Sequence, residues 1–256
     1  MITAGIDIGS ITAKAAVLKD GSIIGTKVGF TGYNAELAGE TIFNELLLEL
    51  GLERNSIDRI ISTGYGRNTV KFAHKAMTEI ICHGAGAHFI NPDVRSVIDV
   101  GGQDSKAMVV DSQGNVKDFV MNDKCAAGTG RFLEVMARAL EVDLDDFGNL
   151  SLQSRSPSKI SSICTVFAES EVISLISKGE SRENIIAGIH ESVAARVSAL
   201  AKRIHATAPI MMTGGVARNI GVVKALENKL SESIEVFDSA QVNGAIGAAL
   251  LAQNLQ

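Results

Sequence analysis

The sequence predicts an α/β protein that contains two copies of one sheet-forming unit. The eleven residues that begin at Asp7 match the eleven that begin at Asp99 in an Asp, a Gly, a Lys, an Ala and a Val, at the same offsets. A turn follows each copy, Asp20-Gly21 or Gln113-Gly114, and a further strand-like run comes next. Chance similarity between two glycine-containing hairpins is the alternative, but five matches followed by the same turn favour an internal duplication.

Hydrophobic patterns with strand and helix periodicity place the elements of the first half. Strands are expected at Ile2–Ile8, Ala13–Lys19, Ser22–Gly29 and Ile57–Thr63, and helices at Asn34–Leu50 and Glu79–Ile90. Gly51 stands where a glycine commonly ends a helix. Strands and helices thus alternate, which is typical of the α/β class.

The second half repeats this plan after the segment Asn91-Pro92-Asp93, so we expect one lobe over residues 1–93 and another over residues 94–256. Strands are expected at Val97–Val100, Ala107–Val110, Val116–Met121, Pro209–Thr213 and Ile234–Phe237. Helices are expected at Thr129–Leu140, Val166–Ser177, Arg182–His205, Ala217–Leu230 and Val242–Gln253. The second and third of these helices form an insertion.

The composition is that of a soluble globular protein, with 46% hydrophobic and 21% charged residues among 256. A net charge of −5 argues against broad nucleic-acid binding, which depends on a basic surface. The first residues lack a positive leader, and the apolar run Ala245–Ala252 is too short to span a bilayer. We therefore expect a cytoplasmic protein with no membrane partner, in which three cysteines do not form a disulfide framework.

Each copy of the repeat places an aspartate and a glycine, two residues apart, in a hairpin turn. A glycine lets the backbone approach a phosphate and offers N–H groups to its oxygens. The aspartate can hold Mg²⁺, usually through water, because Mg²⁺ loses its own water reluctantly. Two such hairpins, at Asp7 and Asp99, are the pattern expected for gripping a triphosphate and its metal ion.

Further glycine clusters stand before predicted helices or within one. Ala127-Gly128-Thr129-Gly130 would place N–H donors and the positive end of a helix at an anion. Thr213-Gly214-Gly215-Val216-Ala217 follows an apolar strand, and its missing side chains would leave room for a base or a sugar. Val242–Ala249 is a run of small residues suited to close helix crossing. Taken singly, such a cluster is more often a helix cap or a packing feature.

In their order along the chain, these motifs resemble those of the actin/Hsp70/sugar-kinase ATPase superfamily. The resemblance implies duplicated actin/ribonuclease-H-like lobes with an ATP cleft between them. It assigns the first phosphate loop to Asp7, Gly9, Ser10, Thr12 and Lys14, and the second to Asp99, Gly101, Gly102, Gln103 and Asp104. Asp7 and Asp99 would organise Mg²⁺ through water.

The same resemblance implies contacts to the rest of the nucleotide. Gly128, Thr129 and Gly130 would contact phosphate or ribose, Glu134 would lie on the ribose side, and Gly214, Gly215 and Ala217 would line the base. Gln103 is our first choice to orient the attacking water, because an amide both donates and accepts hydrogen bonds. Asp104 is the second choice.

The three cysteines have different surroundings. Cys82 lies next to Ile80 and Ile81 in a predicted helix and is interpreted as a buried apolar residue. Cys125 and Cys164 each immediately precede a predicted helix, whose N-terminus would stabilise a thiolate. From the residues alone, two buried cysteines remain an equal alternative. Two thiolates are too few for a [4Fe–4S] cluster, whereas a symmetric dimer would supply four.

The segments Asn122–Glu134 and Cys164–Val172 resemble the activators of 2-hydroxyacyl-CoA dehydratases, which belong with the ATPase subunits of benzoyl-CoA reductases in the BadF/BadG/BcrA/BcrD-type family. The resemblance covers essentially the whole chain. It implies a homodimer with one [4Fe–4S] cluster bridged by Cys125 and Cys164 of both subunits. It also implies oxygen sensitivity, and ATP-driven electron transfer from a ferredoxin or flavodoxin to a separate iron–sulfur dehydratase or reductase.

Two other functions fit parts of the pattern. One is a small-molecule kinase of the same superfamily, acting on a sugar or an acid, although no residues for binding such a substrate are evident. The other is a non-catalytic nucleotide switch or assembly protein, which would need no iron. Either function would leave the cysteines without a role.

Overall fold

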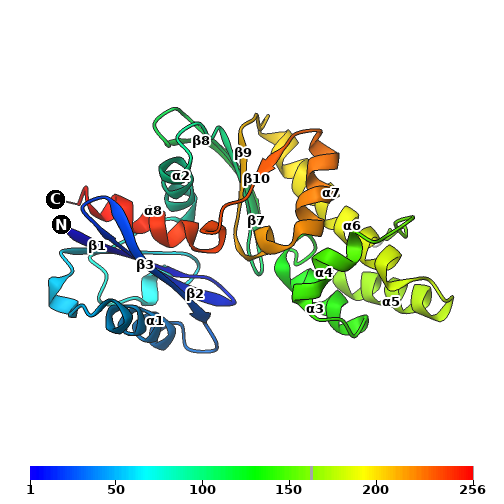
Figure 1. Ribbon diagram of the computed structural model, residues 1–256, viewed down its shortest axis with the longest axis horizontal. Helices are drawn as coiled ribbons and strands as arrows, with labels where there is room; N and C mark the ends of the chain where they lie inside the picture. The colour runs from blue at the N-terminus through cyan, green and yellow to red at the C-terminus, as the bar shows by residue number, and fades with distance from the viewer. Residues whose placement is uncertain (162–163, 256) are drawn as a thin grey trace. The chain divides into compact units, whose positions relative to one another are not determined.

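The computed structural model describes residues 1–161 and 164–255 (Figure 1). Its first five-stranded sheet has the order β3-β2-β1-β4-β5. The strands are β1 (Ile2–Ile8), β2 (Thr12–Lys19), β3 (Ser22–Phe30), β4 (Arg59–Thr63) and β5 (Lys75–Ala76). Antiparallel pairing of β1 with β2 sets Asp7 opposite Lys14, and parallel pairing of β1 with β4 sets Asp7 beside Thr63. The register therefore brings the first predicted loop residues together at one end of the sheet.

The second five-stranded sheet has the order β10-β9-β6-β7-β8. The strands are β6 (Ser96–Val100), β7 (Ser105–Val110), β8 (Val116–Asn122), β9 (Ile210–Thr213) and β10 (Ile234–Glu235). Read from β8 to β10, this order repeats that of the first sheet strand for strand. The duplication inferred from the residues after Asp7 and Asp99 is thus a duplication of sheet topology, and the predicted α/β class is confirmed.

Two helices cover the two faces of the first sheet, α1 (Ala35–Leu50) and α8 (Asn243–Ala252), and α2 (Glu79–Ile90) packs on α8. Alternation along β2 directs Ala13, Ala15 and Val17 to a core with α1, and Ala16 and Leu18 to a core with α8. The Asn34 side chain accepts a hydrogen bond from Leu37 N and caps α1, which ends at Gly51 as predicted. Helix α8 approaches closely, because a methyl group at Gly5 of β1 would overlap Ala245 O.

The remaining helices are α3 (Gly130–Ala139), α4 (Leu144–Ser151), α5 (Thr165–Ser177), α6 (Arg182–Arg203) and α7 (Ile220–Leu230). Helix α4 was not predicted; it is short, and Asp143 caps it by accepting from Asp145 N. The expected helix Ala217–Leu230 starts too early. Its first residues form a 3₁₀ turn, Gly215–Arg218, because Asn219 has extended backbone angles and caps α7 through Val222 N.

The chain separates into two compact units. The first contains Met1–Val97, Val110–Asp118 and the residues from Phe237 onward, and the second contains Ile98–Val109 and Phe119–Val236. The predicted lobe border near residue 93 stays a prediction. Among the described residues, no helix is both long and apolar enough to cross a membrane.

Candidate functional site

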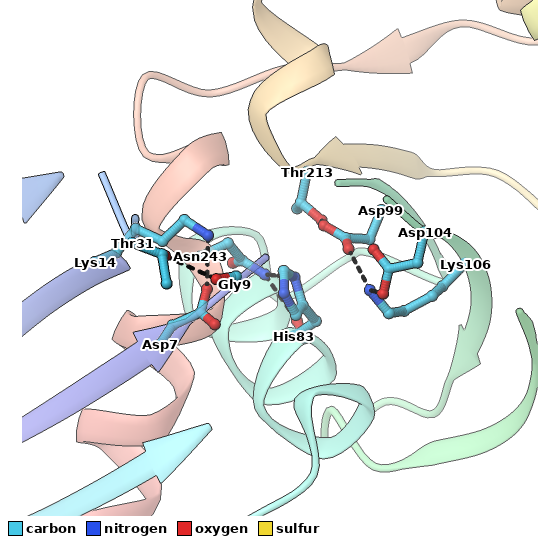
Figure 2. Close-up of polar contacts among 10 residues, drawn as sticks. All are labelled: Asp7, Gly9, Lys14, Thr31, His83, Asp99, Asp104, Lys106, Thr213 and Asn243. Atoms are coloured by element: carbon cyan, nitrogen blue, oxygen red, sulfur yellow. Dashed lines mark hydrogen bonds and ion pairs between the residues drawn. The ribbon is translucent and has the colours of Figure 1, made fainter. Parts of the chain in front are cut away.

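The first predicted phosphate loop is a tight turn between β1 and β2. Gly9 N donates to Thr12 O at 3.0 Å, and this bond closes the turn. The hydroxyl of Thr31, which follows β3, donates to Gly9 O at 2.7 Å (Figure 2). Three strands of the first sheet therefore fix the backbone of this loop. Thr31 was not predicted as a site residue, and no short motif marks it.

Asp7 and Lys14 form an ion pair at the mouth of this loop, with Lys14 Nζ 3.2 Å from Asp7 Oδ2. A methyl group at Gly9 would lie 2.9 Å from Lys14 Nζ, so the ammonium stands directly over the glycine. Gly64 has a φ of +85°, and a side chain there would overlap Asp7 Oδ1. The loop thus places the Lys14 ammonium next to a backbone that no side chain covers, an arrangement that can bind a phosphate group.

The second predicted loop has the same internal bond: Gly101 N donates to Asp104 O at 3.0 Å. The start of α3 is attached to this loop, because Gly130 N donates to Gly101 O at 2.9 Å and Arg131 N donates to Gly102 O at 2.8 Å. The backbone amides of Gly130 and Arg131, at the end of the predicted Gly128–Gly130 turn, therefore hold the second loop in place. Its contact with phosphate or ribose stays a prediction.

Four side chains meet beneath the second loop (Figure 2). Lys106 Nζ lies 3.0 Å from Asp99 Oδ2 and 2.8 Å from Asp104 Oδ2, and the Lys106 side chain is only 2% exposed. The Thr213 hydroxyl donates to Asp99 Oδ1 at 2.8 Å. Both oxygens of Asp99 are thus held by groups of the same unit. Lys106 and Thr213 were not predicted as site residues, although Lys106 is the repeat partner of Lys14.

A threonine–glycine pair recurs after the strand that neighbours each aspartate. Gly214 has a φ of +87°, and a methyl group there would lie 2.9 Å from Asp99 Oδ1 and overlap Val100 O. Thr63-Gly64 holds the same position beside Asp7. Only glycine accepts this backbone conformation so close to a carboxylate. The pairs Thr63-Gly64 and Thr213-Gly214 are a signal of the duplication that the sequence prediction missed.

The structure confirms the predicted surroundings of Cys82 and Cys164, but Cys125 does not immediately precede a helix, because α3 begins five residues later, at Gly130. Cys82 is completely buried, and burial raises the pKa of its thiol to about 12, so it is unreactive. Cys125 is half-buried in the segment between β8 and α3, where the Asn122 side chain donates to Cys125 O at 2.8 Å. Cys164 is exposed at the N-terminus of α5, and its side chain makes no capping hydrogen bond.

No group of three or more His, Cys, Asp or Glu side chains in residues 1–161 and 164–255 is placed to hold a metal ion. Two accessible thiols in one chain do fit half of the four-thiolate set of a [4Fe–4S] cluster. The residues present are therefore compatible with a cluster shared between two copies of the chain.

A model of the BadF/BadG/BcrA/BcrD ATPase family matches residues 4–252. The chain belongs to this family. An activator of lactoyl-CoA dehydratase from Anaerotignum propionicum is 48% identical to it over 98% of this chain and 97% of the relative.

Two solved structures of the family are similar over almost the full length of the chain. One is the (R)-2-hydroxyglutaryl-CoA dehydratase component A of Acidaminococcus fermentans, with 47% identity, a TM-score of 0.96, and coverage of 99% of this chain and 98% of that one. The other is the activator of the 2-hydroxyisocaproyl-CoA dehydratase from Clostridium difficile with bound ADPNP, with 46% identity, a TM-score of 0.94, and coverage of 99% and 95%. The family identified from the cysteine segments is thereby confirmed.

The remaining predicted residues lie at the borders of these loops. Gln103 is exposed on the second loop, next to the half-buried Asp104. Glu134 lies one turn into α3, and Arg131 holds its carboxylate at 3.0 Å. Gly215 and Ala217 lie in the 3₁₀ turn after Thr213. The specific role of each residue stays a prediction.

Helix α5 carries four exposed apolar side chains, those of Val166, Phe167, Ile173 and Ile176. Val166 and Phe167 lie in its first turn, directly after Cys164.

Proposed function

We propose that the chain is an ATP-hydrolysing iron–sulfur activator that transfers a low-potential electron to a separate 2-hydroxyacyl-CoA dehydratase or a related acyl-CoA reductase. One observation carries this proposal: the segment that bears Cys125 is joined to the second phosphate loop. Cys125 lies five residues before Gly130, whose amide donates to Gly101 O at 2.9 Å. A nucleotide-dependent displacement of that loop would therefore be passed to the segment that holds the thiol.

Both hairpins take part in the proposed nucleotide binding. Lys14 and the backbone of Gly9, with the hydroxyls of Ser10 and Thr12, would bind phosphate oxygens, and Gly101 and Gly102 would do so from the second loop. Asp7 and Asp99 would accept hydrogen bonds from the water molecules of a Mg²⁺ ion. The structure supports this because the Asp7–Lys14 and Asp99–Lys106 ion pairs hold both carboxylates in place.

Hydrolysis would proceed by attack of one water on the γ-phosphorus, with cleavage of its bond to the bridging oxygen and release of ADP and phosphate. Gln103 would orient this water, because its exposed amide both accepts and donates hydrogen bonds. Asp104 is the second candidate. Its carboxylate is tied to Lys106 at 2.8 Å, which leaves Gln103 the more adaptable of the two groups.

Cys125 and Cys164 would hold the cluster together with the same two residues of a second copy. When bound, a [4Fe–4S] cluster supplies a one-electron carrier, which a ferredoxin or flavodoxin would reduce and the partner enzyme would oxidise. The exposed apolar side chains of Val166 and Phe167 support a homodimer, because they follow Cys164 directly at the start of α5. We place the protein in the cytoplasm of an anaerobic cell, where thiols stay reduced.

Anaerobic purification with an iron count and a visible spectrum tests the cluster. We expect about four iron atoms per dimer, and none in Cys125→Ala or Cys164→Ala. Cys82→Ala is the matched control and should keep its iron, because the Cys82 side chain is completely buried. A Cys125→Ala protein with full cluster absorbance would contradict the proposal. ATP-dependent electron transfer to candidate dehydratases, assayed without oxygen, tests the activity itself.

A further inference from the structure

A buried histidine in the second compact unit has no part in the function proposed above. His190 lies in α6 and is only 1% exposed. Its imidazole meets the ring of Phe147, in α4, edge to face, and the two ring centroids are 5.3 Å apart. Burial lowers the pKa of His190 to about 3, so the ring is neutral at physiological pH. A neutral imidazole offers one hydrogen-bond donor and one acceptor.

Asn219 determines which ring nitrogen of His190 is the acceptor. The side-chain oxygen of Asn219 accepts a hydrogen bond from Val222 N at 3.1 Å and caps α7. The amide nitrogen of the same side chain lies 3.3 Å from His190 Nε2. A reversed amide would set its nitrogen against the Val222 N–H, and two donors form no hydrogen bond. Since an amide nitrogen only donates, Nε2 accepts and the ring hydrogen is on Nδ1.

The second ring nitrogen of His190 does not explain the presence of an imidazole. Nδ1 is buried and has no hydrogen-bond partner among residues 1–161 and 164–255. A buried donor without a partner lowers stability, and an apolar side chain would fill the same space without that cost. The bond from Asn219 to Nε2 is therefore the interaction that a histidine adds at this position.

Asn219 ends a turn that is held at both of its ends. Just before the turn, the Thr213 hydroxyl donates to Asp99 Oδ1 at 2.8 Å. Inside the turn, Asn219 N donates to Val216 O at 2.9 Å. At the far end, the Asn219 amide attaches the turn to His190 of α6. The second phosphate loop and α6 thus fix the two ends of one short segment.

From these contacts we propose that His190 is a positioning residue for the base-binding turn. Through Asn219 it holds Gly214, Gly215 and Ala217 in the arrangement that receives the base of ATP. This inference rests on the proposed function, in which the chain binds ATP, and on the predicted position of the base at these three residues. A binding surface that already has its bound shape gives higher affinity, because the ligand does not have to order it.

Displacement of a fluorescent ATP analogue from the full chain tests the inference, with ATP and inorganic tripolyphosphate as the two competitors in Mg²⁺. Both competitors carry three phosphate groups, but only ATP carries a base. We expect the wild-type chain to bind ATP more tightly than tripolyphosphate. His190→Leu should weaken ATP binding about tenfold and tripolyphosphate binding less than about twofold. A role in packing alone would not distinguish the two competitors.

Two further variants isolate the hydrogen bond. Asn219→Ser keeps a side-chain oxygen that can cap α7 but lacks the amide donor, so its ATP affinity should fall as in His190→Leu. The double variant should lose no more than either single variant, because both remove the same bond. His190→Gln should retain most of the ATP affinity, because its amide oxygen can accept from Asn219. Asn219→Ser carries the test should His190→Leu not fold.

Phe147→Leu is the matched control. It alters the packing around the imidazole but leaves the bond between Asn219 and His190 in place. The ratio of the ATP affinity to the tripolyphosphate affinity should therefore be that of the wild-type chain.

Three results would overturn the inference while leaving the proposed function intact. One is unchanged ATP affinity in a folded His190→Leu or Asn219→Ser variant. Another is an equal loss of affinity for ATP and for tripolyphosphate. The third is equal affinity of the wild-type chain for the two competitors, because the turn would then contribute nothing through the base. A wild-type chain that binds neither the analogue nor ATP would refute the proposed function itself, and the inference with it.

Discussion

The Asp7 and Asp99 loops share an aspartate, a closing backbone bond and a repeat lysine, yet the two lysines are used differently. Lys14 is 12% exposed, contacts one carboxylate and stands over Gly9. Lys106 is 2% exposed and contacts two carboxylates. The first loop thus keeps a positive charge near its surface, where a ligand can meet it. The second loop uses the equivalent charge to hold its own acidic side chains.

The largest effect that would test this contrast is expected for Lys106→Met. Removing the ammonium leaves Asp99 buried without its counterion, and breaking a buried pair in this way costs about 3–5 kcal/mol of unfolding free energy. Urea unfolding of Lys106→Met and of the wild-type chain measures this loss of unfolding free energy. Adding Asp104→Asn to the same protein should recover part of the loss, because one of the two facing negative charges is then removed. A loss below about 1 kcal/mol would show that Lys106 does not hold the loop.

The next largest effect is expected at the two glycines beside the aspartates. Gly64→Ala and Gly214→Ala each require a positive φ and push a methyl group against a carboxylate oxygen. We expect on the order of 2–4 kcal/mol of destabilisation from each, measured by urea unfolding. Gly21→Ala is the control, since it also has a positive φ but no atom within 4 Å of the added methyl group. Gly21→Ala should lower the free energy of unfolding only by the cost of its strained backbone conformation.

Lys14→Met should destabilise the chain less than Lys106→Met, by about 1–2 kcal/mol, because its ammonium is more exposed and has one carboxylate partner. Its main effect should be on ligand binding, with about tenfold weaker ATP affinity by calorimetry. Lys14→Arg should retain part of that affinity. If Lys14→Met binds ATP normally, the cation over Gly9 does not contact phosphate.

The smallest effect concerns the two equivalent threonines. Thr213→Val removes the hydrogen bond to Asp99 and should cost about 1–2 kcal/mol of unfolding free energy. The Thr63 hydroxyl has no oxygen or nitrogen partner within the described part of the chain, so Thr63→Val should cost less than about 0.5 kcal/mol. Thermal unfolding of the two variants side by side measures the difference. Equal losses would mean that the two loops are held alike.

Much of this fold follows from local patterns. The repeat at Asp7 and Asp99 predicts three consecutive strands in each copy, because alternating residues and turns are encoded within about thirty positions of each other. The sheet order was not predicted, since β4 and β5 join each other and β1 from further along the chain. The burial of Cys82 and the helix start after Cys164 were also predicted correctly, since apolar neighbours and helix starts are local features. The predicted start of this helix at Ala217 was wrong, because Asn219 caps α7 and the helix begins at Ile220 although the helical spacing begins earlier.

The residues that contact the loops could not be predicted from local patterns in the same way. Thr213 meets Asp99 across 114 residues, and Asn243 meets His83 across 160. Asp99, Thr213 and Asn243 each lie in a predicted motif, but the motifs do not show which residue each of them contacts, and a buried histidine or threonine in a sequence is usually a packing residue. Lys106 occupied a repeat position, but only its burial between two carboxylates distinguishes its role from that of Lys14.

The position of α8 has a consequence for how the protein is made. Helix α8 supplies one covering of the first sheet: the Thr3 hydroxyl donates to Ala249 O at 2.8 Å, and Gly5 leaves space for Ala245. Strands β1 and β2, which it covers, are synthesised first, and α8 follows more than two hundred residues later. While the ribosome elongates the chain, one apolar face of these strands therefore stays unshielded. The unit whose strands are synthesised first is consequently completed last, and we expect its exposed apolar face to be the part most prone to misassociation during translation.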